Sequence, residues 1–196
     1  ISPKSALVSL SDKTNLDLLI SFLLERNVEI ISTGGTYKAI KKITDNVIEV
    51  SEYTGHKEMM DGRVKTLHPK IHAGILARRG EDTDVLKSMD YKEIDIVVVN
   101  LYPFEETIKS GCSFEEAIEQ IDIGGPTMIR AAAKNFKDVL VLSDPNDYEE
   151  MISEWNSKNG ISYEFRKKQA TKVFKKMSQY NLSLIHISEP TRQWSI

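Results

Sequence analysis

The chain has 196 residues, 40% of them hydrophobic and 28% charged, which is an ordinary globular composition and predicts one core. Its 26 lysines and arginines are balanced by 29 aspartates and glutamates, and the formal charge of −3 excludes a global attraction to nucleic acid or acidic membranes. The single cysteine, Cys112, excludes an intramolecular disulfide and a zinc site with several cysteine ligands. Because the sequence has no secretory signal and no apolar run of about 20 residues, we expect a cytoplasmic protein with neither nucleic acid nor membrane as partner.

The first half of the chain alternates between strand-like and helix-like patterns. After the first strand-like run, apolar residues at helical spacing put Leu16, Leu19 and Leu23 on one face. The second strand-like run breaks at two glycines and reopens as a short helix. Strands are predicted over residues 5–10, 29–33, 47–50, 71–77 and 94–101, and helices over residues 16–24 and 37–43.

The second half of the chain is mainly helical. A last strand is predicted over residues 139–142, and residues 181–196 lose helical periodicity. We interpret residues 1–180 as the domain and residues 181–196 as an atypical tail without a function of its own, His186 included. Helices are predicted over residues 114–121, 127–135, 145–158 and 163–179, the last two as surface helices.

The alternation of strands and helices predicts an α/β fold with three layers, in which helices flank a mainly parallel sheet. Residues 94–101 (IDIVVVNL) suit the centre of that sheet, because a continuous β-branched run is typical of a strand covered on both faces. Crossovers between parallel strands are right-handed, and ligands bind at the carboxyl ends of the strands. We therefore expect the functional site at that edge.

Two hydroxyl-rich loops follow the first two predicted strands. Glycine lets backbone N–H groups approach a phosphate, and hydroxyl groups and a helix start add further donors. Either loop alone is equally well explained as a helix cap, but two of them beside a basic stretch indicate a phosphate cradle. The cradle is not a Walker loop, since no GK[ST] follows at the required spacing. The residues concerned are Ser9, Ser11, Lys13, Ser32, Thr33, Gly34, Gly35 and Thr36.

A basic stretch at residues 61–74 gathers five cationic or titratable side chains around two glycines and a proline. This is turn chemistry that carries positive charge, and it is suited to holding an anion. The alternative is that these are solvated charges on a strand edge, or that a histidine before proline is packed or bonded to backbone. The side chains are those of Arg63, Lys65, His68, Lys70 and His72.

A second group of residues has the chemistry of general acid and base catalysis. A lysine beside a carboxylate can hold a charged pair ready for proton transfer. Asp122 precedes Gly124 at a helix start, whose N–H groups can brace an anion. Arg130 and Lys134 lie four residues apart on that helix, so Asp122 or a ligand anion is expected between them, although a solvated basic face explains the spacing as well. The four candidates are Lys65, Tyr102, Asp122 and Lys134.

Several motifs appear in the order typical of one family. They are SLSDK at residues 9–13, STGGT at 32–36, GRVKTLHP with IHAGIL at 62–76, NLYPF at 100–104 and IDIGGPTMIRAAAKN at 121–135. Over residues 6–146 the chain resembles the inosine monophosphate (IMP) cyclohydrolase domain, the amino-terminal half of a bifunctional purine biosynthesis enzyme that also carries a formyltransferase. The resemblance implies a methylglyoxal synthase-like, Rossmann-like fold.

The resemblance also implies roles for individual residues. The positions that match Lys65, Tyr102, Asp122 and Lys134 are catalytic in that family. The positions that line the family's nucleotide site correspond to Ser9, Ser11, Lys13, Ser32, Gly35, Thr36, Arg63, Thr66 and Asn100. We add the remaining residues of the two loops and Gly124 to the expected substrate-binding site.

The family reaction closes the purine ring, converting 5-formamidoimidazole-4-carboxamide ribotide to IMP and water, and it implies a homodimer without metal or organic cofactor. Lys65 and Tyr102 would stabilise the formyl oxygen, while Asp122 and Lys134 relay protons. Three alternatives remain open. One is methylglyoxal synthase, whose GGDQ-type segment we do not find. The others are a non-catalytic effector-binding module, as in carbamoyl phosphate synthetase, and an inactive fragment of the bifunctional enzyme.

Overall fold

The computed structural model describes residues 1–101 and 113–188, and within them the chain forms a five-stranded sheet whose neighbouring strands are all parallel. The strand order is β3-β2-β1-β4-β5, so the sheet extends from β1 in both directions. This confirms the predicted α/β class and its parallel sheet. The strands are β1 (Ser5–Leu10), β2 (Glu29–Ser32), β3 (Ile48–Glu49), β4 (Ile96–Asn100) and β5 (Leu140–Leu142).

The centre of the sheet is apolar on both faces. Leu7 of β1 is in register with Ile31 of β2 and Val97 of β4, and all three residues are fully buried. Strand β4 is buried over its whole length, which agrees with the prediction from its β-branched run. The buried central strands therefore form a rigid support for the loops that follow their carboxyl ends.

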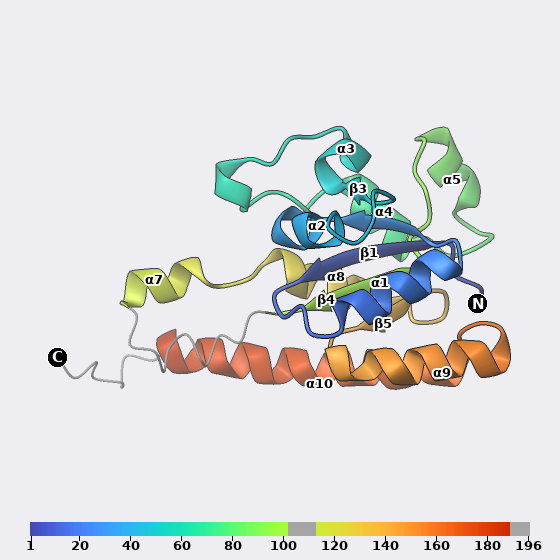
Figure 1. Ribbon diagram of the computed structural model, residues 1–196. Coiled ribbons are helices and arrows are strands. Elements are labelled where there is room, and N and C mark those ends of the chain that lie inside the picture. The colour runs from blue at the N-terminus through green and yellow to red at the C-terminus, as the bar shows by residue number, and fades with distance from the viewer. Residues whose placement is uncertain (102–112, 189–196) are drawn as a thin grey trace.

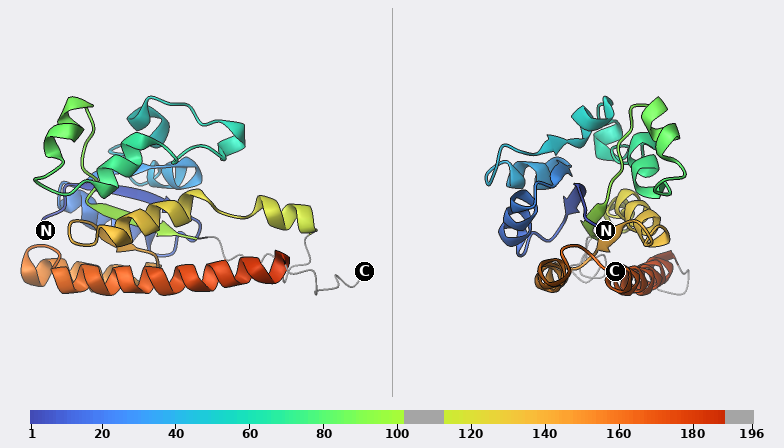
Figure 2. Two further views of the ribbon diagram at one scale, coloured as in Figure 1. Left: turned by 180° about the vertical axis from the view of Figure 1, so that it is seen from behind. Right: turned by 90° about the vertical axis from the view of Figure 1, so that its right-hand side faces the viewer.

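Helices cover both faces of the sheet and complete three layers (Figure 1). On one face α1 and α9 pack together, where the rings of Phe22 and Trp155 meet edge to face at 5.5 Å. On the other face lie α4, α8 and most of α10, which runs beside α9 along one side of the molecule (Figure 2). The helices are α1 (Leu16–Glu25), α2 (Gly34–Ile40), α3 (Val50–Thr54), η1 (Met60–Gly62), α4 (Pro69–Leu76), α5 (Thr83–Ser88), α7 (Phe114–Glu119), α8 (Gly124–Lys134), η2 (Pro145–Asp147), α9 (Tyr148–Lys158) and α10 (Tyr163–Ser188).

The strand predicted over residues 71–77 is wrong, because this segment belongs to helix α4. Pro69 occupies the first turn, where its missing N–H has no intrahelical partner, and the His68 side chain caps the helix. Ile71 and Ile75, four residues apart, are both buried, which is the spacing of a helix face. Gly74 allows close packing: a Cβ there would lie 2.6 Å from the carbonyl oxygen of Lys92.

Other predicted boundaries also differ. Strand β3 has two residues instead of the predicted 47–50, because Val50 already starts α3. Helix α2 begins at Gly34, whose φ of 47° favours glycine, rather than after the loop. Helix α10 continues to Ser188 although the prediction ends at residue 179, because packing that buries Ser183 outweighs the weak helix propensity there. It is also not a plain surface helix, since Val173 and Met177 are in the core.

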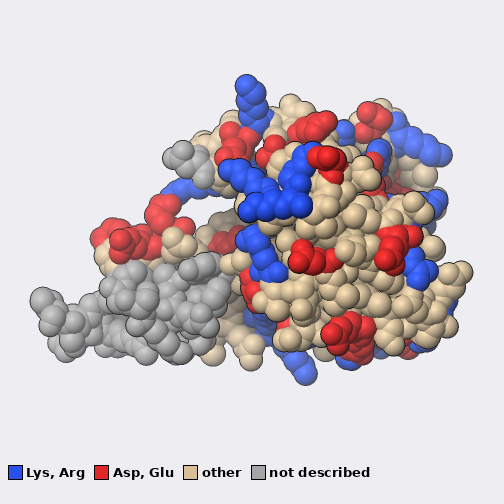
Figure 3. All heavy atoms as spheres, in the orientation of Figure 1, with Lys and Arg blue, Asp and Glu red and all other residues tan. Residues whose placement is uncertain are grey.

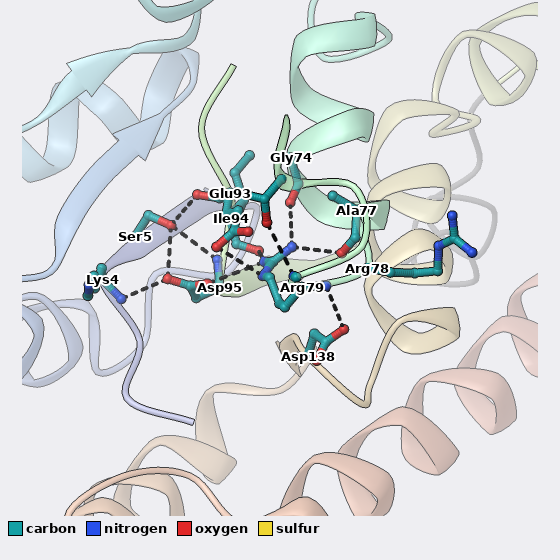
Figure 4. A network of polar contacts seen from close by, with 12 residues as sticks. Lys4, Ser5, Gly74, Ala77, Arg78, Arg79, Glu93, Ile94, Asp95 and Asp138 are labelled. Carbon is teal, nitrogen blue, oxygen red and sulfur yellow. Dashed lines mark hydrogen bonds and ion pairs between the residues drawn. The ribbon is translucent and has the colours of Figure 1, made fainter. Parts of the chain in front are cut away.

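At the amino ends of β1 and β4, the side chain of Arg79 ties several loops together (Figure 4). Its guanidinium donates hydrogen bonds to the carbonyl oxygens of Gly74, Ala77 and Ile94 at 3.3, 2.9 and 2.9 Å. It also donates to Oδ1 of Asp95 at 3.3 Å, and only 17% of the arginine side chain is exposed. The planar, five-donor group suits such multiple acceptors, so this edge of the sheet is held by polar contacts.

Candidate functional site

A cavity of about 780 Å³ lies at the carboxyl ends of β1, β2 and β4. The loops after these strands form one wall, and residues 62–66, the end of α7 and the start of α8 form the rest. A parallel sheet brings the loops after successive strands together at this edge. The cavity therefore lies where the sequence predicts the functional site. The acidic side chains of α7 stand on one side, with Lys and Arg side chains on the neighbouring body (Figure 3).

The two hydroxyl-rich loops contact each other directly. Ser9 Oγ and Thr33 Oγ1 lie 3.0 Å apart and share a hydrogen bond. The Thr36 hydroxyl accepts from the N–H of Leu10 at 2.8 Å and donates to the carbonyl of the same residue at 3.0 Å. At Gly35 no atom of the described residues lies within 4 Å of the position of a Cβ, so the backbone there faces the cavity. Hydroxyl and backbone donors therefore line one wall, as an anionic group requires.

Asn100 ends β4 and braces the loop after β1. Its Oδ1 accepts from the N–H groups of Ser11 and Asp12 at 2.7 and 3.0 Å, and its Nδ2 donates to the carbonyl of Asp12 at 2.7 Å. The residue is buried and also lines the cavity. Its amide is used to hold the shape of this loop.

Two cations of the basic stretch reach the cavity, and each contacts a carboxylate. Arg63 pairs with Glu119 at the end of α7, and Lys65 pairs with Glu58 of its own loop. A Cβ on Gly34 would lie 3.0 Å from Lys65 Nζ, so this ammonium group rests against the loop after β2. The basic stretch and the phosphate-type loop thus form one surface.

Thr66 fixes the approach of the basic stretch to helix α8. It is 7% exposed, and a Cβ on Gly124 would lie 2.7 Å from its Oγ1. Only glycine fits at residue 124 without displacing the hydroxyl group.

Asp122 stands at the start of α8 and lines the cavity. Its Oδ1 accepts from the N–H of Gly125 at 2.9 Å, while its own N–H donates to the hydroxyl of Tyr180 at 2.9 Å. Burial raises the pKa of the Asp122 carboxyl, and hydrogen bonds from the Gly125 and Gly124 amides act in the opposite direction. A carboxylate with a raised pKa is a better proton acceptor, so its environment suits a general base.

Three predicted site residues do not line the cavity. Lys13 turns back on its own loop, with Nζ 3.3 Å from the carbonyl of Leu10. Ser32 is buried and donates to the carbonyl of Val8 at 2.8 Å, which joins β2 to β1. Lys134 is exposed at the far end of α8. Ten residues of helix separate it from Gly124, or about 15 Å, so one chain does not place it beside Asp122 as expected.

Two further residues discussed from the sequence, Tyr102 and Cys112, lie outside the described residues.

The second half of the basic stretch supports the fold instead of the cavity. His68 Nδ1 accepts from the N–H of Lys70 at 3.1 Å, and partial burial lowers the pKa of the imidazole, which keeps that nitrogen an acceptor. Lys70 lies over the rings of Tyr53 and Tyr91 at 5.1 and 5.7 Å.

Sequence reasoning missed the two acidic partners of the cavity cations, Glu58 and Glu119. Neither lies in a motif of phosphate or acid–base chemistry, and Glu119 follows Arg63 by 56 residues. Arg63 and Glu119 meet because of the position that α7 takes in the fold. Ser113 and Glu116 form a capping box at the start of α7, with hydrogen bonds of 3.2 and 2.8 Å. This pattern predicts the start of the helix, but it does not predict the ion pair between Arg63 and Glu119.

No group of three or more His, Cys, Asp or Glu side chains within the described residues is arranged to hold a metal ion. The chemistry that these residues offer is anion binding and proton transfer.

Comparison with known proteins identifies the family of this fold. A family model described as an MGS-like domain matches residues 16–127, and one described as AICARFT/IMPCHase bienzyme matches residues 132–193. Among solved structures, the crystal structure of ForH superposes with a TM-score of 0.82 at 31% sequence identity, covering 95% of this chain and 100% of that one.

Curated relatives point to one protein. The bifunctional purine biosynthesis protein PurH of Clostridium acetobutylicum is 55% identical over 180 residues, which are 91% of this chain and 36% of that protein. PurH of Fusobacterium nucleatum is 54% identical over 183 residues, with 92% and 36% coverage. This chain thus spans 36% of the length of these relatives. It belongs to the family of MGS-like domains and corresponds to the IMP cyclohydrolase region of PurH.

Proposed function

We propose that this chain is an IMP cyclohydrolase, which closes the purine ring of 5-formamidoimidazole-4-carboxamide ribotide and releases water. The observation that carries this proposal is the cavity, which combines hydroxyl-rich loops, Arg63, Lys65 and the half-buried carboxyl of Asp122 at the carboxyl edge of the sheet. The similarity to PurH, a bifunctional purine biosynthesis protein of which this chain spans 36%, supports a substrate from purine synthesis.

The ribotide phosphate would bind where the hydroxyls of Ser9 and Thr33 meet, with Arg63 as counter-ion. Fixing the phosphate and the base in one cavity brings the carboxamide nitrogen and the formyl carbon of the same molecule together. Ring closure is intramolecular, so such positioning removes much of the entropic barrier.

In the chemical step the carboxamide nitrogen attacks the formyl carbon and forms the new C–N bond. The formyl oxygen gains negative charge, for which the Lys65 ammonium is the donor at the cavity wall. Asp122 accepts the proton of the attacking nitrogen, as the raised pKa of its carboxyl favours. The oxygen leaves as water, with one hydrogen from the carboxamide and one from the formamide nitrogen.

Other parts of the assignment remain proposals about the assembly. Lys134 is about 15 Å from the start of α8, so a catalytic role would require a second copy to supply it, which agrees with the proposed homodimer. Tyr102 keeps its proposed role at the formyl oxygen. No described helix is both long and apolar enough to cross a bilayer. The place of the chain's relatives in purine biosynthesis supports a cytoplasmic enzyme, for which we propose residues 1–180 as the domain and residues 181–196 as an atypical tail.

The test is a spectrophotometric assay of the purified chain with the formamido ribotide. We expect wild-type turnover and a loss of about 100-fold or more in kcat for Lys65→Ala, because a donor to the developing oxyanion is removed. The matched control is Lys168→Ala, which removes an exposed lysine that pairs with Glu150 far from the cavity. Ribotide binding without turnover would contradict the proposal and favour a non-catalytic effector-binding module.

A further inference from the structure

The ion pair between Lys65 and Glu58 joins a residue inside the cavity to one outside it. Lys65 lines the cavity, whereas Glu58 is absent from its walls. The lysine side chain is 23% exposed and the glutamate side chain is 51% exposed. The carboxylate therefore approaches the ammonium group from the solvent side, and the other side of this group is left facing the cavity.

Local backbone structure places the two residues together. Met59 and Val64 form an antiparallel bridge, with the N–H of Val64 donating to the carbonyl of Met59 at 3.3 Å, and η1 turns the chain between them. Glu58 and Lys65 flank this bridge, so their side chains leave from neighbouring positions. The ammonium group is then confined between the carboxylate and Gly34.

We propose that Glu58 is a positioning residue that holds the Lys65 ammonium group against the loop after β2, at the point where the substrate oxygen would gain charge. This inference rests on the proposed cyclohydrolase function. A lysine has four rotatable side-chain bonds, and an exposed one samples many rotamers. The carboxylate removes that freedom before substrate binds, which is how preorganised donors contribute to catalysis.

The charged groups around the pair are consistent with this role. The hydrogen bond and charge of Lys65 lower the pKa of the Glu58 carboxyl, with a smaller contribution from the charge of Lys38 of α2, so Glu58 stays ionised at neutral pH. Among the described residues, the other charged side chains that line the cavity are those of Arg63, Glu119 and Asp122, and Arg63 has its own partner in Glu119. A purely stabilising role is a poor explanation, because ion pairs with an exposed member contribute little to stability.

The first measurement is the reactivity of the Lys65 amine in the wild-type chain and in Glu58→Gln, by trace acetylation at pH 8 and mass spectrometry of the peptide. Loss of the ion pair should raise Lys65 acetylation roughly threefold relative to other lysines, as for a weakened exposed pair. The control Glu29→Gln breaks the Lys92–Glu29 pair and should leave Lys65 labelling unchanged. This measurement needs no turnover, so it remains informative if the cyclohydrolase proposal fails.

The second measurement is steady-state kinetics with the ribotide. We expect Glu58→Gln to lower kcat about tenfold with KM changed less, because the donor is misplaced and phosphate binding is retained. Glu58→Asp should recover part of kcat, and thermal unfolding midpoints should equal that of the wild type. Wild-type turnover with unchanged kcat in Glu58→Gln, or unchanged Lys65 labelling, would overturn the positioning role. Absence of wild-type turnover would instead count against the function itself.

Discussion

Asp122 has one role in the fold, at the start of α8, and a proposed role in proton transfer. Holding a carboxyl group in both roles has a cost in stability. Asp122 accepts the N–H of Gly125 at the start of α8, yet its burial disfavours the ionised form. The raised pKa means that the folded state binds a proton more readily than the unfolded state does. Its contribution to the free energy of unfolding is present at low pH and is lost as pH rises through the folded-state pKa.

We therefore predict that Asp122→Asn is more stable than the wild type at pH 7, by about 1 kcal/mol, and inactive. Asparagine keeps an oxygen that accepts from Gly125 but carries no buried charge. Urea unfolding at pH 7 and at pH 3.5 measures the difference, which should shrink at the lower pH. A destabilised variant at pH 7 would show that the ionised carboxylate is the form that the fold favours.

The interactions of Glu58 and Glu119 show why part of the site could not be predicted from the sequence. Serine, threonine and glycine in the loops after β1 and β2 indicate phosphate chemistry wherever the sheet brings them together. Ion pairs between exposed side chains depend on the relative positions that loops and short helices take in the folded chain. The sequence contains no local pattern for them.

Helix α4 is the element that the sequence pattern placed in the wrong class. Its apolar residues Ile71 and Ile75 suit a helix face, but the run IHAGIL is short enough to suit a buried strand as well. Pro69 after a capping histidine was the deciding signal. By contrast, α1 and β4 were predicted in the right class, because α1 carries leucines at helical spacing and β4 begins with a run of β-branched residues. The short, largely apolar run of β1 was also predicted as a strand.

At the scale of elements, we predict that Gly74→Ala destabilises the chain by about 2 kcal/mol. The new Cβ would lie 2.6 Å from the backbone carbonyl of Lys92 and 3.0 Å from the Ile94 side chain, and backbone cannot move aside cheaply. Chemical denaturation measures the change. The control Gly80→Ala tests positive φ alone, since nothing lies within 4 Å of a Cβ there. Equal effects of the two substitutions would show that α4 is not closely packed.

The Arg79 network, which supports stability, and the candidate functional site lie at opposite ends of the central strands. The Arg79 network closes the amino ends of β1 and β4, and the cavity opens at their carboxyl ends. Strand β4 has five residues and so spans about 16 Å between the two edges. The overall arrangement was predictable from the alternation of elements. The path of α10 across the sheet face that α4 and α8 cover was not predictable, because tertiary packing decides it.

We predict that Arg79→Met lowers the free energy of unfolding by about 3 kcal/mol while kcat and KM at low temperature remain those of the wild type. The loss comes mainly from the Ile94 carbonyl and Oδ1 of Asp95, which lose the arginine as their donor. Thermal unfolding and the ribotide assay at 10 °C measure the two quantities. A loss of kcat equal to that of a cavity variant would mean that the two edges are coupled.

The pairing of both cavity cations changes how an anion enters. Arg63 and Lys65 are already neutralised by Glu119 and Glu58, and Asp122 adds a third carboxylate nearby. Among the described residues the cavity is therefore no positively charged funnel, and the proposed ribotide phosphate would enter by exchange, taking the place of the Glu119 carboxylate beside Arg63. Such a wall discriminates by competition: a small anion that makes one contact gains little over the internal partner, whereas a ribotide that also meets the hydroxyl loops gains enough to replace it.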